Sequence, residues 1–186
     1  MIFATNNKNK LAELKEIFKE YEIKSLKEAE ISIDVVEDQD SFYGNALKKA
    51  KEIYIKAHEP VIADDSGLCI EALNDWPGVM TSRFMGKDAS DSDRNNEILS
   101  RMKNIKNKKA KVVCTLVYYD GVNIIDATGE LLGTITEERR GLNGFGFDDI
   151  FELKTGETLA ELTSEEKNKV SARFIAAKAL KQKLKL

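Results

Sequence analysis

The stretch PVIADDSGL, residues Pro60–Leu68, places two adjacent acidic residues directly after an apolar run. The run at 61–63 favours a strand buried on both faces, and the polar residues follow where that strand is expected to end. Neighbouring carboxylates repel each other, so their charged forms need a cation nearby, and oxygen-rich clusters suit magnesium. Ligands of open α/β sheets bind outside the carboxyl ends of strands. The stretch therefore indicates a cation site or, because Asp, Ser and Gly favour turns, a solvated turn.

The whole chain sets broad limits on what this protein is. Its 186 residues suffice for one large domain or two small lobes with a sizeable core. It contains 29 Lys and Arg against 32 Asp and Glu, a net charge of −3, which argues against a general nucleic-acid binder. Only three apolar residues follow Met1, and no apolar run reaches membrane-spanning length. We therefore expect a soluble, cytoplasmic protein with no membrane partner. Cys69 and Cys114 stand in apolar runs and are expected to be buried reduced thiols.

The first strand and helix are predicted to be joined by a polar loop. Ile2–Ala4 is a buried strand by composition, and apolar residues recur at helical spacing from Lys10 onward. The loop between them, TNNKNK, combines asparagine, lysine and free N–H groups at a helix start, which together favour anion binding. Asn6 tolerates the left-handed conformation that such a turn often requires.

The remaining pattern predicts an α/β fold. A helix is expected over Phe42–Ala57 with Ser41 as its N-cap, and the capping box at 163–166 predicts a terminal helix. The predicted strands cover residues 22–26, 31–36, 68–73, 112–119, 122–127 and 129–135, with an antiparallel hairpin turning at Asp120-Gly121. No linker or internal repeat divides the chain, so residues 1–186 are expected to form a single domain.

The glycine-rich stretch GLNGFGFDDIF, residues Gly141–Phe151, permits a loop that approaches a ligand closely. Its residues Phe145 and Phe147 could stack on a nucleotide base or pack into the core, and the sequence leaves these two roles equally open. The spacing is not that of a dinucleotide-binding fingerprint, because no helix opens from the stretch.

Four segments in this order resemble the inosine triphosphate pyrophosphatase family: TNNKNK, Glu37 with DDSG, GFGFDDIF and ELTSEEKNKVSAR. The resemblance covers nearly the whole chain. It implies an elongated, two-lobed α/β fold, with a central mixed sheet flanked by helices and a cleft between the lobes. It also implies hydrolysis of non-canonical purine nucleoside triphosphates (ITP, dITP, XTP) to the monophosphate and pyrophosphate, a magnesium cofactor and a homodimer.

The resemblance assigns roles to individual residues. Asp65 matches the catalytic acid, with Ser66 beside it, and Glu37 matches a metal-side carboxylate. The substrate is expected to contact the residues that match the triphosphate loop, the helix lysine, the base segment and the terminal helix: Thr5, Asn6, Asn7, Lys10, Lys49, Phe145, Gly146, Phe147, Asp148, Lys167, Ala172 and Arg173.

Two departures from the family pattern are visible. The triphosphate loop is TNN where the family has TGN, so Asn6 replaces a glycine. The family's Ser-His-Arg is Ser171-Ala172-Arg173 here, so only Arg173 is left to donate to the 6-oxo group of the purine. This second change bears on base selectivity more than on hydrolysis.

The chemistry agrees with the residues independently. A polyanionic triphosphate must be neutralised by lysines and magnesium before an anionic nucleophile approaches it. Glu37, Asp64 and Asp65 can hold the metal, and Asp65 can orient or deprotonate water. Two alternatives follow from Ala172: a nucleotide-binding module with weak catalysis, or a pyrophosphatase for other modified nucleotides.

Overall fold

The computed structural model describes residues 1–86 and 88–185. They form one mixed sheet with the strand order β2-β1-β3-β5-β6-β7, and β4 pairs with β3. The elements are β1 (Ile2–Phe3), α1 (Lys8–Ile17), β2 (Lys24–Ser25), α2 (Phe42–Ala57), β3 (Val61–Ile70), η1 (Glu71–Leu73), β4 (Trp76–Pro77), η2 (Gly78–Met80), α3 (Asp91–Met102), β5 (Lys109–Tyr119), β6 (Ile124–Ile135), β7 (Phe151–Glu152), α4 (Ser164–Val170) and α5 (Ala172–Leu184). This confirms the predicted α/β class with a mixed sheet flanked by helices.

The chain divides into two compact units. Unit 1 comprises Met1–Ser66, Cys114–Gly129 and Ala172–Leu186, and unit 2 comprises Gly67–Val113 and Glu130–Ser171. Because β3, β5 and β6 each continue from one unit into the other, the backbone of the sheet is shared between the units.

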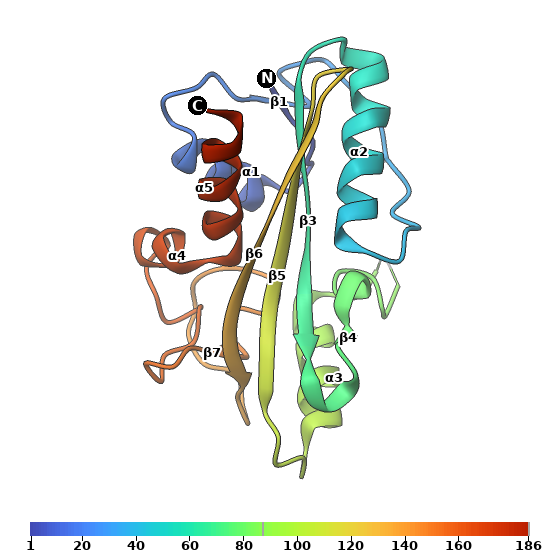
Figure 1. The fold of residues 1–186 in the computed structure, drawn as a ribbon. Coiled ribbons are helices and arrows are strands. Elements are labelled where there is room, and N and C mark those ends of the chain that lie inside the picture. The colour runs from blue at the N-terminus through green and yellow to red at the C-terminus, as the bar shows by residue number, and fades with distance from the viewer. Residues whose placement is uncertain (87, 186) are drawn as a thin grey trace. The chain divides into compact units, whose positions relative to one another are not determined.

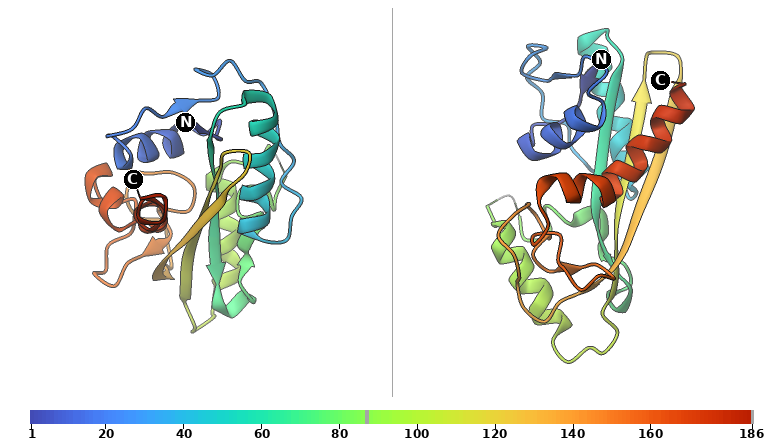
Figure 2. Two further views of the ribbon diagram at one scale, coloured as in Figure 1. Left: turned by 45° about the horizontal axis from the view of Figure 1, so that its top comes forward. Right: turned by 90° about the vertical axis from the view of Figure 1, so that its left-hand side faces the viewer.

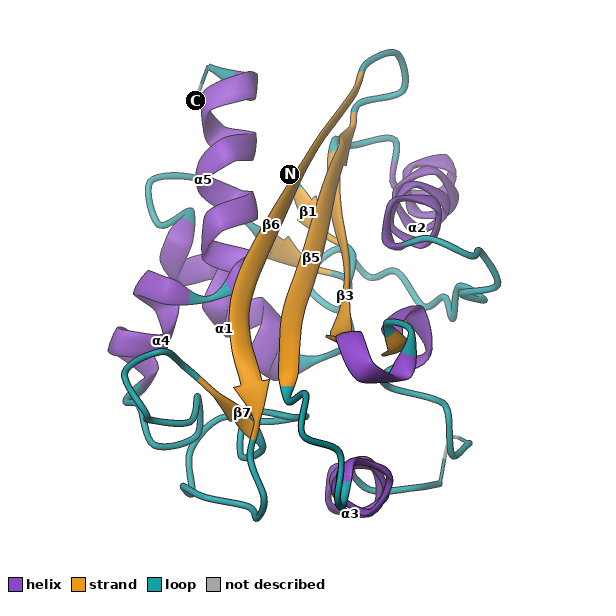
Figure 3. Ribbon diagram, turned by 60° about the horizontal axis from the view of Figure 1, so that its bottom comes forward, coloured by secondary structure: helices purple, strands orange, loops and turns teal. Residues whose placement is uncertain are grey.

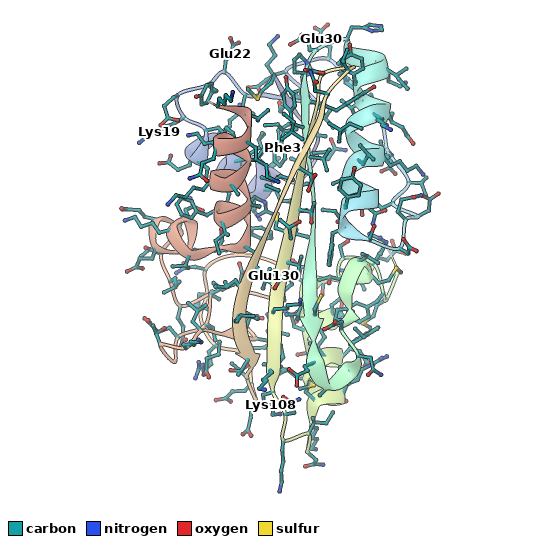
Figure 4. The ribbon with its side chains drawn as sticks, viewed as in Figure 1. Phe3, Lys19, Glu22, Glu30, Lys108 and Glu130 are labelled. Atoms are coloured by element: carbon teal, nitrogen blue, oxygen red, sulfur yellow. The ribbon has the colours of Figure 1, made fainter. Side chains whose placement is uncertain are left out.

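In unit 1 the helices cover both faces of the sheet. Figure 1 shows α2 on one side of β3, with α1 and α5 on the other, and the left view of Figure 2 agrees. The α2 side is closed by a cluster of buried apolar residues from β1, α2, β3 and β5 and from the positions just after β1 and β2: Ile2, Ala4, Leu26, Ala46, Ala50, Ile53, Val61, Ala63 and Val117. Phe3 is fully buried, whereas Lys19 and Glu22 are exposed at the surface (Figure 4).

In unit 2 the sheet is extended by short strands. β4 runs antiparallel to β3, and β7 runs antiparallel to β6, beside the end of that strand in Figure 3. The connection from β6 through β7 to α4 carries the glycine-rich stretch, and α3 starts at a complete capping box between Ser90 and Asp93.

Two predicted helices have the expected starts. Ser41 is the N-cap of α2, and its hydroxyl accepts the N–H of Gly44. Thr163 is the N-cap of α4, with Glu166 completing the predicted capping box. The terminal helix is interrupted at Ser171, so it forms α4 and α5 rather than one continuous helix.

The prediction of a possible turn at Asp64–Gly67 was wrong. β3 is one uninterrupted strand of ten residues through this segment, and both aspartates are buried, with 1% and 4% of their surface exposed. Turn preferences of Asp, Ser and Gly are weak, and here tertiary contacts with the two carboxylates outweigh them.

Other strand predictions also needed correction. Residues 31–36 alternate apolar and polar side chains but pair with no strand among the described residues, and partly buried Ile31, Ile33 and Val35 pack against the apolar cluster of unit 1 instead. The hairpin turn at Asp120-Gly121 is confirmed, but β6 continues through Gly129 as a single strand rather than two.

Within the described part of the chain, every helix is too short or too polar to span a bilayer.

Gly129 of β6 marks a close approach of α5 in unit 1. A Cβ atom there would lie 2.2 Å from the carbonyl oxygen of Ala172 and 2.6 Å from the amide nitrogen of Ala176. Both are backbone atoms, so the helix or the strand would have to move.

We therefore expect Gly129→Ala to lower the free energy of unfolding by about 1–3 kcal/mol, the range typical of overpacking. Gly156→Ala is the control, since its φ is 92° but nothing lies within 4 Å of the added Cβ. It should cost only the left-handed strain, about 1 kcal/mol. Urea unfolding measures both, and equal losses would contradict close packing at Gly129.

Candidate active site

The acidic pair lies just beyond the end of β1. Phe3, the last residue of β1, pairs in parallel with Ile62, so β3 continues past its neighbour at Asp64 and Asp65. The loop that follows β1 leads directly into α1. The carboxylates are thus in the middle of β3 and at the carboxyl end of β1, the usual position for ligands in such sheets.

Asp64 faces the side of β3 that carries α1 and α5. Its Oδ2 lies 3.1 Å from the Lys10 ammonium and accepts from the Arg173 guanidinium at 3.0 and 3.3 Å. Burial alone would raise the pKa of Asp64, but the charges of Lys10 and Arg173 outweigh it, and the pKa is lowered. Asp64 is therefore ionised and neutralised by two cations.

Arg173 connects this pair to two further groups. Its guanidinium donates to the Glu13 carboxylate on α1 and to the Ser66 hydroxyl at 3.2 Å. Glu13, Asp64 and Arg173 are all buried. Burial disfavours the charged guanidinium, but the neighbouring carboxylates more than compensate and raise the pKa of Arg173. The side chain is thus a buried, charged link between α1, β3 and α5.

Asp65 faces the opposite side, toward α2, because successive side chains of a strand alternate between its faces. Its Oδ2 accepts from the amide of Asn45 at 2.9 Å. Burial raises the pKa of Asp65 to about 6; the charge of Lys49 opposes this and that of Glu37 adds to it. Two adjacent aspartates therefore have opposite pKa shifts.

Lys49 and Glu37 complete this side of the site. The Lys49 ammonium donates to Glu37 Oε1 at 2.5 Å. Desolvation would lower the pKa of Lys49, but the charges of Asp64, Glu37 and Asp65 raise it. The segment that carries Glu37 is held by Asn45, whose Oδ1 accepts the N–H of Gln39 at 3.0 Å. Asn45 thus fixes both the acidic segment and Asp65.

The donor set bears on a divalent metal ion. The described residues contain no group of three or more His, Cys, Asp or Glu placed to hold one. Glu37 and Asp65 are close enough for the charge of Glu37 to raise the pKa of Asp65, and magnesium commonly uses only one or two carboxylates plus substrate phosphates. The two carboxylates therefore fit a magnesium ion that binds together with a triphosphate.

The metal-ligand role expected for Asp64 stays a prediction. Its Oδ2 is occupied by Lys10 and Arg173, while Oδ1 is buried without a hydrogen-bond partner. The structure thus places Asp64 as the countercharge of two basic side chains.

The loop after β1 is shaped by its own side chains. Asn7 is the N-cap of α1, and its Oδ1 accepts the N–H groups of Asn9 and Lys10. The hydroxyl of Thr5 accepts the N–H of Asn7 at 3.1 Å. Asn6 is not among the described residues with positive φ, so the expected left-handed conformation is not used. The structure brings Lys10 into the acidic site, whereas Thr5 and Asn7 order the loop.

The predicted base segment forms a separate cluster in unit 2. Asp148 Oδ2 accepts from the Lys167 ammonium at 2.6 Å and from the N–H of Phe145 at 2.8 Å. The Lys167 ammonium also lies 4.1 Å from the centroid of the Phe145 ring. Gly146 has a φ of 65°, and Phe145 and Phe147 are both half-buried. Three of the predicted residues, Phe145, Asp148 and Lys167, are therefore assembled by direct contacts within one loop and α4.

Ala172, the position of the missing histidine, begins α5 and is 2% exposed. A histidine there would need more room than the buried alanine occupies. Arg173, expected to face a purine, instead has Glu13, Asp64 and Ser66 as partners. The base-reading role of both positions stays a prediction.

Sequence reasoning missed Glu13 and Asn45. Glu13 follows Lys10 by three residues and Asn45 precedes Lys49 by four, so each shares a helix face with a predicted site residue. That spacing was the available signal.

Comparisons with known proteins identify the family of this chain. The sequence profile of the Ham1 family matches residues 1–183. A curated relative from Clostridium tetani (strain Massachusetts / E88), named dITP/XTP pyrophosphatase, is 41% identical over 192 aligned positions, covering 100% of this chain and 96% of the relative. A Bacillus subtilis (strain 168) protein of the same name is 40% identical and covers 98% of this chain and 96% of its own.

Solved structures give the same result for the fold. The Staphylococcus aureus Ham1 protein superposes with a TM-score of 0.90 at 32% identity, covering 99% of this chain and 97% of that one. A HAM1 protein from Coxiella burnetii has the same TM-score and coverage at 35% identity. With matches over almost its entire length in family profile, sequence and structure, this chain belongs to the Ham1 family.

Proposed function

We propose that this protein hydrolyses non-canonical purine nucleoside triphosphates such as dITP, XTP and ITP to the nucleoside monophosphate and pyrophosphate. The observation that carries the proposal is the buried acidic pair of β3, with Lys10 and Arg173 against Asp64 and Lys49 beside Asp65. The relatives named dITP/XTP pyrophosphatase support the substrate class.

In this proposal the phosphates bind between two lysines of unit 1. Lys10 is held by Asp64 and Lys49 by Glu37, so both ammonium groups are in place before substrate arrives. Preorganised charges of this kind stabilise the charge that develops in the transition state. The loop Thr5–Asn7 contributes the start of α1 to the same anion site.

Asp65 is the proposed general base. Its pKa of about 6 lies close to neutrality, where a carboxylate both remains ionised and accepts a proton readily. Asn45 orients Asp65 by donating a hydrogen bond to its Oδ2. The other lone pairs of the Asp65 carboxylate are then the ones that contact water and metal.

Magnesium is the proposed cofactor, held by Glu37 and Asp65. When bound, it would neutralise phosphate oxygens and polarise the scissile phosphorus–oxygen bond. Asp64 keeps the role that its contacts support: it holds Lys10 and Arg173 in the site.

The base is proposed to bind at the loop Phe145–Asp148. A half-buried Phe145 under the Lys167 ammonium offers an aromatic face, and Asp148 fixes both groups. Ring stacking tolerates any purine, so selectivity requires polar contacts as well. Ala172 and Arg173 remain candidates for these.

Two other attributes belong to the same proposal. A homodimer and a cytoplasmic location follow from the family resemblance and from a substrate that arises in the nucleotide pool. Nucleic acid is not an expected partner, given the net charge of −3.

The first prediction concerns the products. With magnesium, the protein should release pyrophosphate and a monophosphate from dITP, XTP or ITP faster than from the four canonical triphosphates. EDTA should abolish the release. Orthophosphate as the first product would contradict the assignment of the bond. Binding without turnover would favour a nucleotide-binding module with weak catalysis. Preference for a modified pyrimidine or guanine nucleotide would favour a pyrophosphatase for other modified nucleotides.

The second prediction concerns Asp65. Asp65→Asn removes the charge at nearly constant volume, so kcat should fall by a factor of about 10²–10⁴. Circular dichroism should show an unchanged fold. If kcat is retained, the base is another residue, and Glu37→Gln is the next variant to measure.

The third prediction concerns pH and stability in metal-free buffer. The pKa of Asp65 rises from 3.8 to about 6 on folding, so its ionisation destabilises the fold. This loss of stability is absent below the unfolded pKa of Asp65. It grows as the pH rises from the unfolded to the folded pKa and is complete above about pH 6. The free energy of unfolding of Asp65→Asn, relative to that of wild type, should therefore be higher at pH 8 than at pH 4, by an amount on the order of 1–3 kcal/mol.

Asp38→Asn is the control of opposite sign. Hydrogen bonds from Lys48 and Gln39 lower the pKa of Asp38, so its contribution is present at high pH and lost as pH falls. Urea unfolding of both variants and wild type at pH 4, 6 and 8 measures the differences. If the difference in unfolding free energy between Asp65→Asn and wild type does not change with pH, the pKa of Asp65 is not shifted by folding.

A further inference from the structure

We propose that Asn95 of α3 and Asp91, one turn before it, are positioning residues. They hold the backbone at Gly146 and thereby determine the conformation of the proposed base-binding loop Phe145–Asp148. The proposal rests on the proposed function, since it takes Phe145–Asp148 as the place where the base binds. Neither residue is assigned a contact with substrate.

Asn95 makes two hydrogen bonds to the loop. Its amide nitrogen donates to the carbonyl oxygen of Gly146 at 2.8 Å and to Asp149 Oδ1 at 2.7 Å. The side chain is only 2% exposed. Removing it would leave a carbonyl and a carboxylate without this donor in a partly buried position, which is costlier than losing a solvent-exposed bond.

Asp91 holds the other side of Gly146. Its Oδ2 accepts the N–H of Gly146 at 2.8 Å. The two peptide groups that flank Gly146 are therefore both anchored to α3, by residues four apart on one helix face. Gly146 joins Phe145 to Phe147, so these anchors fix the directions in which the two rings leave the backbone.

A second pair of contacts stiffens the same connection. Arg139 donates to Asp149 Oδ2 at 2.6 Å and to the Ser92 hydroxyl at 2.5 Å. Asp149 thus accepts from Asn95 and from Arg139 on different oxygens. The loop is tied to α3 through Gly146 and Asp149, and to α4 through Asp148 and Lys167.

The two attachments have different chemistry. The α4 attachment places an ammonium over the Phe145 ring and belongs to the proposed binding face. The α3 attachment consists of main-chain and carboxylate contacts, so it acts on substrate only through the loop. Small misplacements of a binding group weaken substrate positioning strongly. Loosening α3 from the loop should therefore weaken base binding and leave the chemistry at Asp65 intact.

The experiment compares Asn95→Ala with Asn96→Ala. Asn96 is the next residue of the same helix and is exposed, and its side chain makes no hydrogen bond with another described residue, so it is a matched control. For Asn95→Ala we expect KM for ITP to rise roughly 5- to 20-fold, as for the loss of one or two hydrogen bonds, with kcat within about twofold. The preference for ITP over ATP in kcat/KM should shrink, and Asn96→Ala should match wild type.

Asp91→Ala keeps the test decisive if Asn95→Ala does not fold. The Asp91 side chain is 57% exposed, so its loss should be tolerated, and KM should rise in the same direction by a smaller factor. An unchanged KM in every folded variant of the pair, or an equal effect in Asn96→Ala, would overturn the proposal. A fall in kcat alone would overturn it too.

Failure of the proposed function would be visible separately. If wild type releases no pyrophosphate from any triphosphate, the function is wrong, and amide hydrogen exchange of residues 145–147 then tests the positioning role. Asn95→Ala should accelerate that exchange and Asn96→Ala should not; equal rates would overturn the role.

Discussion

The structure of unit 1 depends on burying two neighbouring carboxylates in one strand. An isolated buried carboxylate is strongly unfavourable, so each must find a cation or a hydrogen-bond donor. The strand separates the two problems, because Asp64 and Asp65 face opposite sides of the sheet. Helices α1 and α5 supply Lys10 and Arg173 on one side, and α2 supplies Asn45 and Lys49 on the other.

The two buried carboxylates are compensated in different ways, and this difference gives them different pKa values. Asp64 receives two direct ion pairs, and its pKa is lowered. Asp65 receives a neutral donor and a lysine that is shared with Glu37, and its pKa is raised. The same residue type thus serves as a fixed countercharge at one position and as a proton acceptor at the next. Separated pKa values of paired carboxylates are a recurring way to assign such roles.

The sequence was informative where local chemistry decides the structure. The caps at Ser41 and Thr163 and the turn at Asp120 depend on neighbouring residues, and they were predicted correctly. It was less informative where distant residues decide. The DDSG segment has turn composition but is held in β3 by Lys10, Asn45 and Arg173, and residues 31–36 alternate correctly but have no strand to pair with.

The candidate site shows the same division. Ordered motifs led to Asp65, Lys10, Lys49 and Glu37, which the structure brings together. Asn45, Glu13 and Asn95 were not found. Helix spacing from Lys49 and Lys10 pointed to the faces of the first two, but their partners lie on other elements, and Asn95 had no such signal. Arg173 was identified but expected to face a base, and its three partners, of which Glu13 and Asp64 are buried, could not be inferred from spacing alone.

The uninterrupted course of β3 has a consequence for motion. Exposed loops open at little free-energy cost, whereas the central strand of a sheet separates from its neighbours only in rare, nearly global fluctuations. Because the two aspartates belong to such a strand, their spacing persists whether or not anything is bound. Adaptation to different ligands is then left to the surrounding side chains and to the segments on either side of α1 and before α2. The two aspartates therefore keep their positions in β3 while those side chains and segments adapt.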